Sequence, residues 1–207
     1  MVFAVIDLGT NTFNLLIAER NSNATFKKLF NTKIAVKLGE NTINADFISD
    51  ASFQRGINAL KQFQQYLLDY NVEYTYAFAT SAIRSASNGN EFVIQAKKIS
   101  GIDISVIDGN EEADLIYYGN RMAVQMNQST SLIMDIGGGS TEFILGNKDT
   151  VLWKRSFKLG AARLLDKFNL SDPITFEETI DFNNYLKLEV APLLDAVKHY
   201  QPIDRKS

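Results

Sequence analysis

A short pattern occurs twice in this chain of 207 residues. Each copy consists of an apolar run, an aspartate, a polar turn that contains glycine, and a second apolar run. The copies span residues 2–17 and 131–145, and they align without a gap, so that Asp7 corresponds to Asp135. Each copy predicts two strands joined by a tight loop, and the repetition predicts a chain built from two related domains.

The order of the expected elements also repeats, which indicates an α/β fold. The expected strands are 2–7, 12–19, 25–37, 74–79, 102–107, 131–136, 141–146 and 150–157. The expected helices are 52–70, a short one carrying Arg84, 91–99, 108–123, 159–168 and one within 175–200.

The polar stretch 127–130 contains no apolar residue and is the natural domain boundary. We therefore expect one domain over 1–126 and a second over 127–207. The second domain has too few strands to match the first, so either it is abbreviated or the chain is truncated.

Composition excludes several kinds of chemistry. The chain has no cysteine, which removes disulfides, thiolate catalysis and cysteine metal sites and fits a cytoplasmic protein. Its single histidine, His199, lies in a polar tail, which argues against a Ser–His–Asp triad. A net charge of −3 gives no general attraction to nucleic acid or anionic membranes. No apolar run approaches the roughly 18 residues of a spanning helix.

The two turns are candidates for phosphate binding. Glycine leaves backbone N–H groups open to an anion, because no Cβ blocks the approach. Ordinary hairpin turns are the alternative for either turn taken singly. Two turns in register, each after a strand that ends in aspartate, favour phosphate. The candidate residues are Gly9, Thr10, Asn11 and Thr12 in the first turn and Gly137, Gly138, Gly139 and Ser140 in the second.

Three acids lie beside these turns. Asp7 and Asp135 occur where strands end, and Glu142 follows the second turn. Hard oxygen ligands suit Mg²⁺ or another divalent cation, which is held mostly through water and substrate phosphate. The alternative role of the aspartates is to cap the turns.

Glu112 is a candidate catalytic base. Asp108 can cap a helix and Glu111 can reach back to that cap, whereas Glu112 has no capping duty. In a chain without a usable histidine or cysteine, a carboxylate is the most available group to activate water. The alternative is that the helix dipole favours acids in the first turn.

Arg84 lies in a short helix after a strand, where a guanidinium can point at phosphate. A surface ion pair is the alternative. Other basic residues near the turn-bearing segments give a weaker indication of an anion path, since most such side chains are solvated. They are Lys33, Lys37, Lys154, Arg155, Lys158 and Arg163.

Taken together, these motifs resemble the exopolyphosphatase/guanosine pentaphosphate phosphohydrolase (Ppx/GppA) family of the actin-like, sugar kinase and Hsp70 ATPase superfamily. The Asp135 motif is shared across that superfamily, while the segments around Arg84 and Glu112 select the family. The matching segments are 7–11, 37–40, 79–84, 88–92, 109–119, 135–142 and 159–164. Lys37 departs from the arginine usual in its segment, which keeps the charge but loses bidentate geometry.

The resemblance implies duplicated actin-like (ribonuclease H-like) domains with mixed five-stranded sheets, the second incomplete here. It implies hydrolysis of a terminal phosphoanhydride bond of inorganic polyphosphate or pppGpp in an interdomain cleft. In that family Glu112 matches the base that activates water, Asp7, Asp135 and Glu142 match acids near the metal, and Arg84 neutralises phosphate.

Two functions other than phosphoanhydride hydrolysis remain open. An actin-like ATPase or kinase is one alternative, and a non-catalytic sensor of polyphosphate or (p)ppGpp is another. The expected partner is a polyanionic phosphate substrate, and we expect neither nucleic-acid binding nor integral membrane association. A homodimer is one form in which such a chain can occur.

Overall fold

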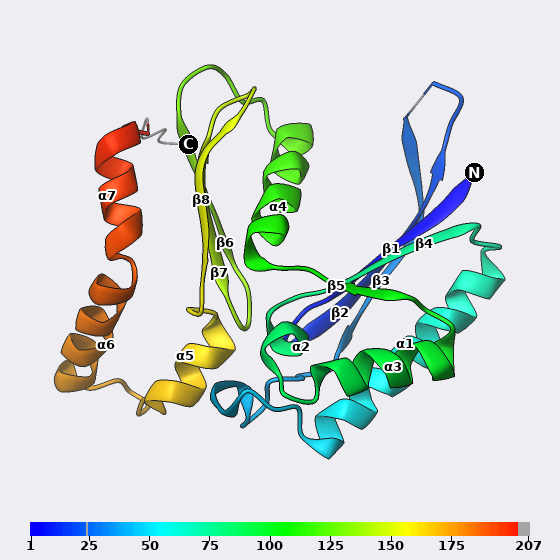
Figure 1. The fold of residues 1–207 in the computed structure, drawn as a ribbon, viewed down its shortest axis with the longest axis horizontal. Helices are drawn as coiled ribbons and strands as arrows, with labels where there is room; N and C mark the ends of the chain where they lie inside the picture. Colours follow the sequence, from blue (N-terminus) through cyan, green and yellow to red (C-terminus); the bar gives the residue numbers. More distant parts are fainter. Residues whose placement is uncertain (24, 203–207) are drawn as a thin grey trace. The chain divides into compact units, whose positions relative to one another are not determined.

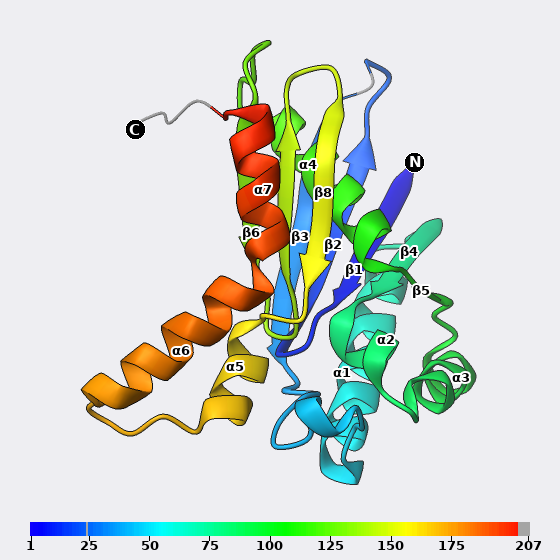
Figure 2. The same cartoon turned by 60° about the vertical axis from the view of Figure 1, so that its left-hand side comes forward.

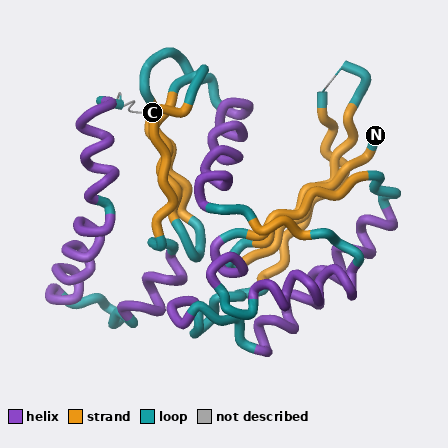
Figure 3. The backbone as a smooth tube through the Cα atoms, in the orientation of Figure 1, coloured by secondary structure: helices purple, strands orange, loops and turns teal. Residues whose placement is uncertain are grey.

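A computed structural model describes residues 1–23 and 25–202. The chain forms two compact units, Met1–Ile107 and Asp108–Ser207. Each unit combines a sheet with helices, which confirms the predicted α/β class (Figures 1 and 3).

The sheet of the first unit has five strands in the order β3-β2-β1-β4-β5. The strands β1, β2 and β3 form an antiparallel meander, whereas β4 and β5 run parallel to β1, so the sheet is mixed as expected. Their bounds are β1 Val2–Leu8, β2 Thr12–Arg20, β3 Phe26–Ala35, β4 Tyr74–Ala79 and β5 Ile104–Val106.

Helices α1 (Asp50–Asp69) and α3 (Gly89–Ser100) lie together against one face of this sheet (Figure 1). The apolar spacing along α1 turns one side of the helix inward, and Phe63 is fully buried there. At Gly56 a Cβ would lie 2.7 Å from the ring of Phe92, so glycine allows α1 and α3 to approach closely. The short 3₁₀ segment η1 (Ile43–Ala45) precedes α1, and α2 (Ser81–Ser85) precedes α3.

The sheet of the second unit is an antiparallel meander in the order β6-β7-β8, the same plan as the first three strands of the chain. Helices α4 and α7 pack on its opposite faces (Figures 1 and 2). The bounds are β6 Ser131–Ile136, β7 Thr141–Gly146, β8 Val151–Phe157, α4 Gly109–Ala123, α5 Ala161–Phe168, α6 Phe176–Glu189 and α7 Ala191–Tyr200.

The division between the units differs from the expected boundary after residue 126. The compact second unit begins at Asp108, so it includes α4. The reason is packing: Ala113 and Tyr117 of α4 form a buried cluster with Ile144 of β7. The polar stretch 127–130 is therefore a connection within the second unit, between α4 and its sheet.

The single helix expected within 175–200 is two helices. Helix α6 ends at Glu189, and α7 starts at Ala191 with Pro192 in its first turn. Proline has no N–H to continue a helix but fits a first turn, which explains the break. None of the helices in the described part of the chain is long and apolar enough to cross a membrane.

Candidate functional site

The two repeated turns have the same backbone construction. The N–H of Gly9 donates to the carbonyl of Thr12 at 3.1 Å, and the N–H of Gly137 donates to the carbonyl of Ser140 at 2.9 Å. A Cβ would lie 2.9 Å from that carbonyl oxygen at Gly9 and 3.1 Å from it at Gly137. Both turns therefore favour glycine at their first position, and Gly9 more strongly than Gly137.

Each turn leaves two consecutive N–H groups inside this bridge. In the described part of the chain, the N–H groups of Thr10 and Asn11, and those of Gly138 and Gly139, donate to no backbone carbonyl. Successive amides of this kind form a concavity that binds anions. The geometry thus supports both turns as candidate phosphate loops.

Two carbonyl groups of the first loop accept hydrogen bonds from a neighbouring segment of the first unit. The N–H of Leu38 donates to the carbonyl of Thr10 at 2.7 Å, and the N–H groups of Val36 and Lys37 both donate to the carbonyl of Asn11 at 2.9 Å. These donors lie in the segment that follows β3. Because the carbonyls are held on this side, the orientation of the first loop is fixed by the protein.

The second loop is held in the same manner by the start of α5. The N–H groups of Ala161 and Ala162 donate to the carbonyls of Gly137 and Gly138, each at 2.9 Å. The N–H of Arg163 also donates to the carbonyl of Gly138 at 3.2 Å. The contact is so close that a Cβ on Gly160, the residue before α5, would lie 2.4 Å from the backbone of Gly138.

The acids beside the loops occupy corresponding places across their hairpins. Asp7 lies opposite Asn14, and Asp135 lies opposite Glu142. The side-chain amide of Asn14 donates to Asp7 Oδ2 at 3.1 Å, so the carboxylate has a hydrogen-bond partner across the hairpin. Both aspartates are exposed, whereas Glu142 is buried.

The buried Glu142 accepts a hydrogen bond of 2.7 Å from the hydroxyl of Ser156 on β8. Among the described residues no group of three or more His, Cys, Asp or Glu side chains is arranged to hold a metal ion. Mg²⁺ commonly uses only one or two carboxylates together with water and substrate phosphate. The exposed carboxylates of Asp7 and Asp135 have the right chemistry for that manner of binding, and their metal role stays a prediction.

Glu112 lies in the first turn of α4, which Asp108 caps: its carboxylate accepts from the N–H groups of Asn110 and Glu111 at 2.7 and 2.9 Å. Glu112 itself is partly buried, and its own N–H donates to the carbonyl of Asp108 at 3.0 Å, as helical geometry requires.

The direction of α4 brings Glu112 toward the second loop. The hydroxyl of Tyr117 donates to the carbonyl of Asn147, just beyond the far end of β7. One turn earlier in α4, Asp114 pairs with Lys154 of β8. Moving back along α4 therefore means moving along the sheet toward residues 137–140, and Figure 1 shows the first turn of α4 at the end nearer that loop.

Arg84 is partly buried in α2 of the first unit. Its Nη1 donates to the carbonyl of Ile107 at 2.9 Å, which ties α2 to the segment after β5. Arg84 therefore has a structural role within the first unit, and its phosphate contact stays a prediction.

Several basic residues have structural roles that sequence reasoning missed. Arg163 is buried, at 6% exposure, and its Nε donates to the carbonyl of Gly139 at 3.1 Å. Arg155 stacks over the ring of Phe157, with 5.2 Å from Cζ to the ring centroid. Arg55 of α1 contacts the segment behind the first loop. The sequence did contain a signal for Arg55 and Arg163. Each lies in the helix that follows the third strand of its repeat.

The structure thus gathers the candidate residues into two sets. The first unit carries Asp7, the first loop and Arg84. The second unit carries Glu112, Asp135, Glu142 and the second loop.

Solved structures with this fold are known. The chain is 41% identical to an exopolyphosphatase from Cytophaga hutchinsonii, with a TM-score of 0.96, and the match covers 99% of this chain and 65% of that one. It is 27% identical to the Ppx/GppA enzyme of Aquifex aeolicus, with a TM-score of 0.75, covering 93% of this chain and 64% of that one. The actin-like fold expected from the sequence is confirmed.

A family model and a curated relative also match the chain. The bifunctional 3-dehydroquinate synthase/phosphatase of Fusobacterium nucleatum is 34% identical over 205 residues, which cover 94% of this chain and 31% of that protein. The chain therefore spans less than a third of the length of this relative. The family model for Ppx/GppA phosphatases matches residues 16–203. The chain belongs to the Ppx/GppA phosphatase family.

Proposed function

We propose that the protein hydrolyses the terminal phosphoanhydride bond of inorganic polyphosphate or of the 5′ end of pppGpp. The observation that carries this proposal is the pair of matched loops, each with two consecutive N–H groups available to an anion, in a chain of the Ppx/GppA family. The relative from Cytophaga hutchinsonii is described as an exopolyphosphatase, which supports polyphosphate as a substrate class.

The loops bind and orient the phosphates in this proposal. The amides of Thr10 and Asn11 in one loop and of Gly138 and Gly139 in the other donate to phosphate oxygens, as a preorganised backbone can do without moving. The guanidinium of Arg84 adds positive charge that a chain with a net charge of −3 does not supply in general.

Asp7, Asp135 and Glu142 are the proposed acids of a Mg²⁺ site. When bound, such an ion neutralises phosphate charge that develops during transfer. The exposed carboxylates of Asp7 and Asp135 are the direct ligands in this arrangement, and the buried Glu142 acts from beside Asp135, its partner across the hairpin.

Glu112 is the proposed general base. Its carboxylate accepts a proton from water as the water oxygen bonds to the terminal phosphorus. The bond from that phosphorus to the bridging oxygen breaks, and the electron pair stays with the shortened chain. The products are orthophosphate and a substrate one phosphate shorter, and the proton on Glu112 then returns to solvent.

The test is a comparison of substrates. The purified protein is given Mg²⁺ and equal concentrations of polyphosphate, pppGpp or ATP, and released orthophosphate is measured. We expect release from polyphosphate, pppGpp or both at a higher kcat/KM than from ATP. Release from ATP only would favour an actin-like ATPase or kinase instead. Binding of polyphosphate without any release would show a sensor.

The metal assignment has its own test. Asp135→Asn should raise the Mg²⁺ concentration that gives half-maximal activity, because an amide oxygen is a weaker ligand than a carboxylate. Asp149→Asn, on the exposed turn between β7 and β8, is the control. An unchanged Mg²⁺ dependence in Asp135→Asn would exclude Asp135 as a ligand.

A further inference from the structure

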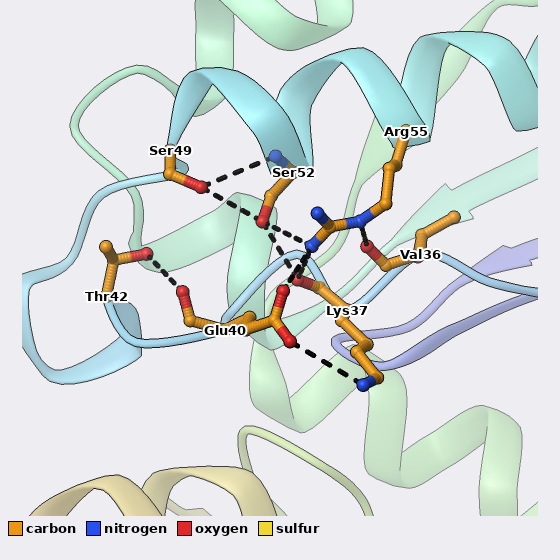
Figure 4. A network of polar contacts seen from close by, with 7 residues as sticks. All are labelled: Val36, Lys37, Glu40, Thr42, Ser49, Ser52 and Arg55. Atoms are coloured by element: carbon orange, nitrogen blue, oxygen red, sulfur yellow. Dashed lines mark hydrogen bonds and ion pairs between the residues drawn. The ribbon is translucent and has the colours of Figure 1, made fainter.

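Arg55 of α1 extends its side chain to the segment that follows β3 (Figure 4). Its Nε donates to the carbonyl of Val36 at 2.8 Å, and its Nη2 lies 3.1 Å from the carbonyl of Lys37. The same nitrogen lies 2.8 Å from Oε2 of Glu40 and 2.9 Å from the hydroxyl of Ser52. One planar guanidinium therefore holds two successive carbonyls and a carboxylate.

The segment that Arg55 holds is the one that holds the first loop. The N–H groups of Val36 and Lys37 donate to the carbonyl of Asn11, and the N–H of Leu38 donates to that of Thr10. The carbonyl and the N–H of Val36 thus link α1 to the loop through a single residue. The guanidinium is therefore joined to the phosphate loop by one hydrogen bond to Val36, the backbone of Val36 and one hydrogen bond from Val36 to Asn11.

The backbone of this segment is in a conformation that needs support. Lys37 has φ of 45°, in the left-handed region that non-glycine residues seldom adopt. Such a conformation persists only where the surroundings determine it. The carbonyl of Lys37 accepts from both Ser52 Oγ, at 3.0 Å, and Arg55. At Gly39 a Cβ would lie 3.0 Å from Cγ2 of Thr10, so the segment also packs tightly on the loop.

The second repeat has a matching arrangement. Arg163 of α5, the helix that follows the third strand of that repeat, donates from Nε to the carbonyl of Gly139 in the second loop. Arg55 lies in the helix that follows the third strand of the first repeat, and it reaches the first loop through Val36 and Lys37. Each phosphate loop is therefore held in orientation by an arginine behind it.

We propose that Arg55 is a positioning residue for substrate phosphate. By fixing Val36 and Lys37 it keeps the carbonyls of Thr10 and Asn11 turned inward and their N–H groups turned toward the phosphate. This inference rests on the proposed function, because it assigns Arg55 to the phosphate loop of that same reaction. Arg55 touches the loop's supports and not the substrate, so it acts through the loop.

The experiment compares Arg55→Ala and Arg55→Lys with Lys61→Ala, an exposed position on the same helix. We expect Arg55→Ala to lower kcat/KM for polyphosphate roughly 10- to 100-fold, mainly through a higher KM, since small misplacement of binding groups has effects of that size. Arg55→Lys should stay well below wild type, because an ammonium cannot span both carbonyls as the planar fork does. Lys61→Ala should match wild type.

A second measurement needs no activity. Hydrogen exchange of the amides of Val36, Lys37 and Leu38, without substrate, should be faster in Arg55→Lys than in wild type. If wild type releases no phosphate while this exchange is faster, the proposed function fails and the hold of Arg55 on the loop stands. If wild type releases phosphate and the kcat/KM of Arg55→Lys lies within twofold of the wild-type value, the positioning role is overturned.

A lower melting temperature with unchanged KM would also overturn it, because that pattern marks a residue that only stabilises the fold. Should Arg55→Ala fail to fold, Glu40→Gln serves beside Arg55→Lys. That variant removes the charge that orients the guanidinium at 2.8 Å, and we expect the same rise in KM with a smaller amplitude. An unchanged KM in both folded variants would contradict the proposal.

Discussion

Glu142 and Ser156 lie opposite each other across β7 and β8, and the serine hydroxyl donates to Glu142 Oε1 at 2.7 Å. Glu142 is only 1% exposed, so its carboxyl group depends on protein partners rather than on water. An acid in such a place is held in one orientation beside Asp135 and the second loop. Ser156 is therefore a support of the candidate site that its sequence context did not indicate.

Ser156→Ala should lower both stability and activity. Removing the donor leaves a buried acceptor short of a partner, which costs about 1–3 kcal/mol. Thermal unfolding and phosphate release measure the two effects. Ser87→Ala, at an exposed serine, is the control and should change neither. A Ser156→Ala protein with wild-type melting temperature and rate would show that the hydrogen bond has no role.

Gly160→Ala should be strongly disruptive, because the added methyl group would lie 2.4 Å from the backbone of Gly138 and Gly139. The second loop or the start of α5 must move, and overpacking of this kind costs roughly 1–3 kcal/mol or more. Gly119→Ala is the matched control, since nothing lies within 4 Å of a Cβ there. As an interior position of α4, it should gain roughly 0.5–1 kcal/mol.

The melting temperature and the rate of phosphate release are compared between Gly160→Ala and Gly119→Ala. The prediction is contradicted if Gly160→Ala melts and turns over substrate as Gly119→Ala does.

Glu178 predicts a stability change at acidic pH. The Ser171 hydroxyl, at 2.6 Å, and the N–H groups of Thr175 and Ser171 donate to its carboxylate and lower its pKa from 4.5 to about 2. Its folded-state pKa lies below its unfolded value, so its contribution to stability is present above pH 4.5. That contribution is lost as pH falls from about 4.5 to about 2.

Glu178→Gln should lower the melting temperature at pH 7, because it removes the charged acceptor of the α6 capping box. The same variant should show a smaller loss of stability than wild type between pH 4.5 and pH 2. Glu177→Gln is the neighbouring control. An equal loss in wild type and Glu178→Gln over that range would reject the assignment.

The sequence predicted the loops well because their signal is local. An apolar run that ends in Asp7 or Asp135 and meets glycine is a strand entering a tight turn, and the duplication placed both turns in one register. The Gly9 and Gly137 bridges, at 3.1 and 2.9 Å, confirm that equivalence in detail.

The boundary could not be predicted in the same way, because it depends on packing between distant segments. A polar stretch such as 127–130 signals a loop but not which sheet the preceding helix covers. The partners of α4 are decided by burial of Ala113 and Tyr117 against Ile144, a contact that no local pattern reveals.

Long-range hydrogen bonds account for the other omissions. Arg55 reads from the sequence as a polar position on an amphipathic helix, yet its side chain bonds the carbonyl of Val36. Arg163 reads as one of several basic residues, yet it is buried against Gly139. In each case the acceptor is a backbone carbonyl, which has no signature in the amino-acid sequence.

The central claim is that Glu112, rather than its neighbour, activates water. Glu111 and Glu112 are adjacent in the first turn of α4, so they share the helix dipole and the Asp108 cap. The most direct test is the rate of orthophosphate release from polyphosphate and pppGpp by Glu112→Gln beside Glu111→Gln, with the substrate affinity of each measured separately.

We expect Glu112→Gln to lose roughly 100- to 10,000-fold in kcat, the usual contribution of a positioned general base, with substrate affinity retained. Glu111→Gln should keep the wild-type rate. Full activity in Glu112→Gln, or an equal loss in both variants, would contradict the assignment of Glu112 as the catalytic base.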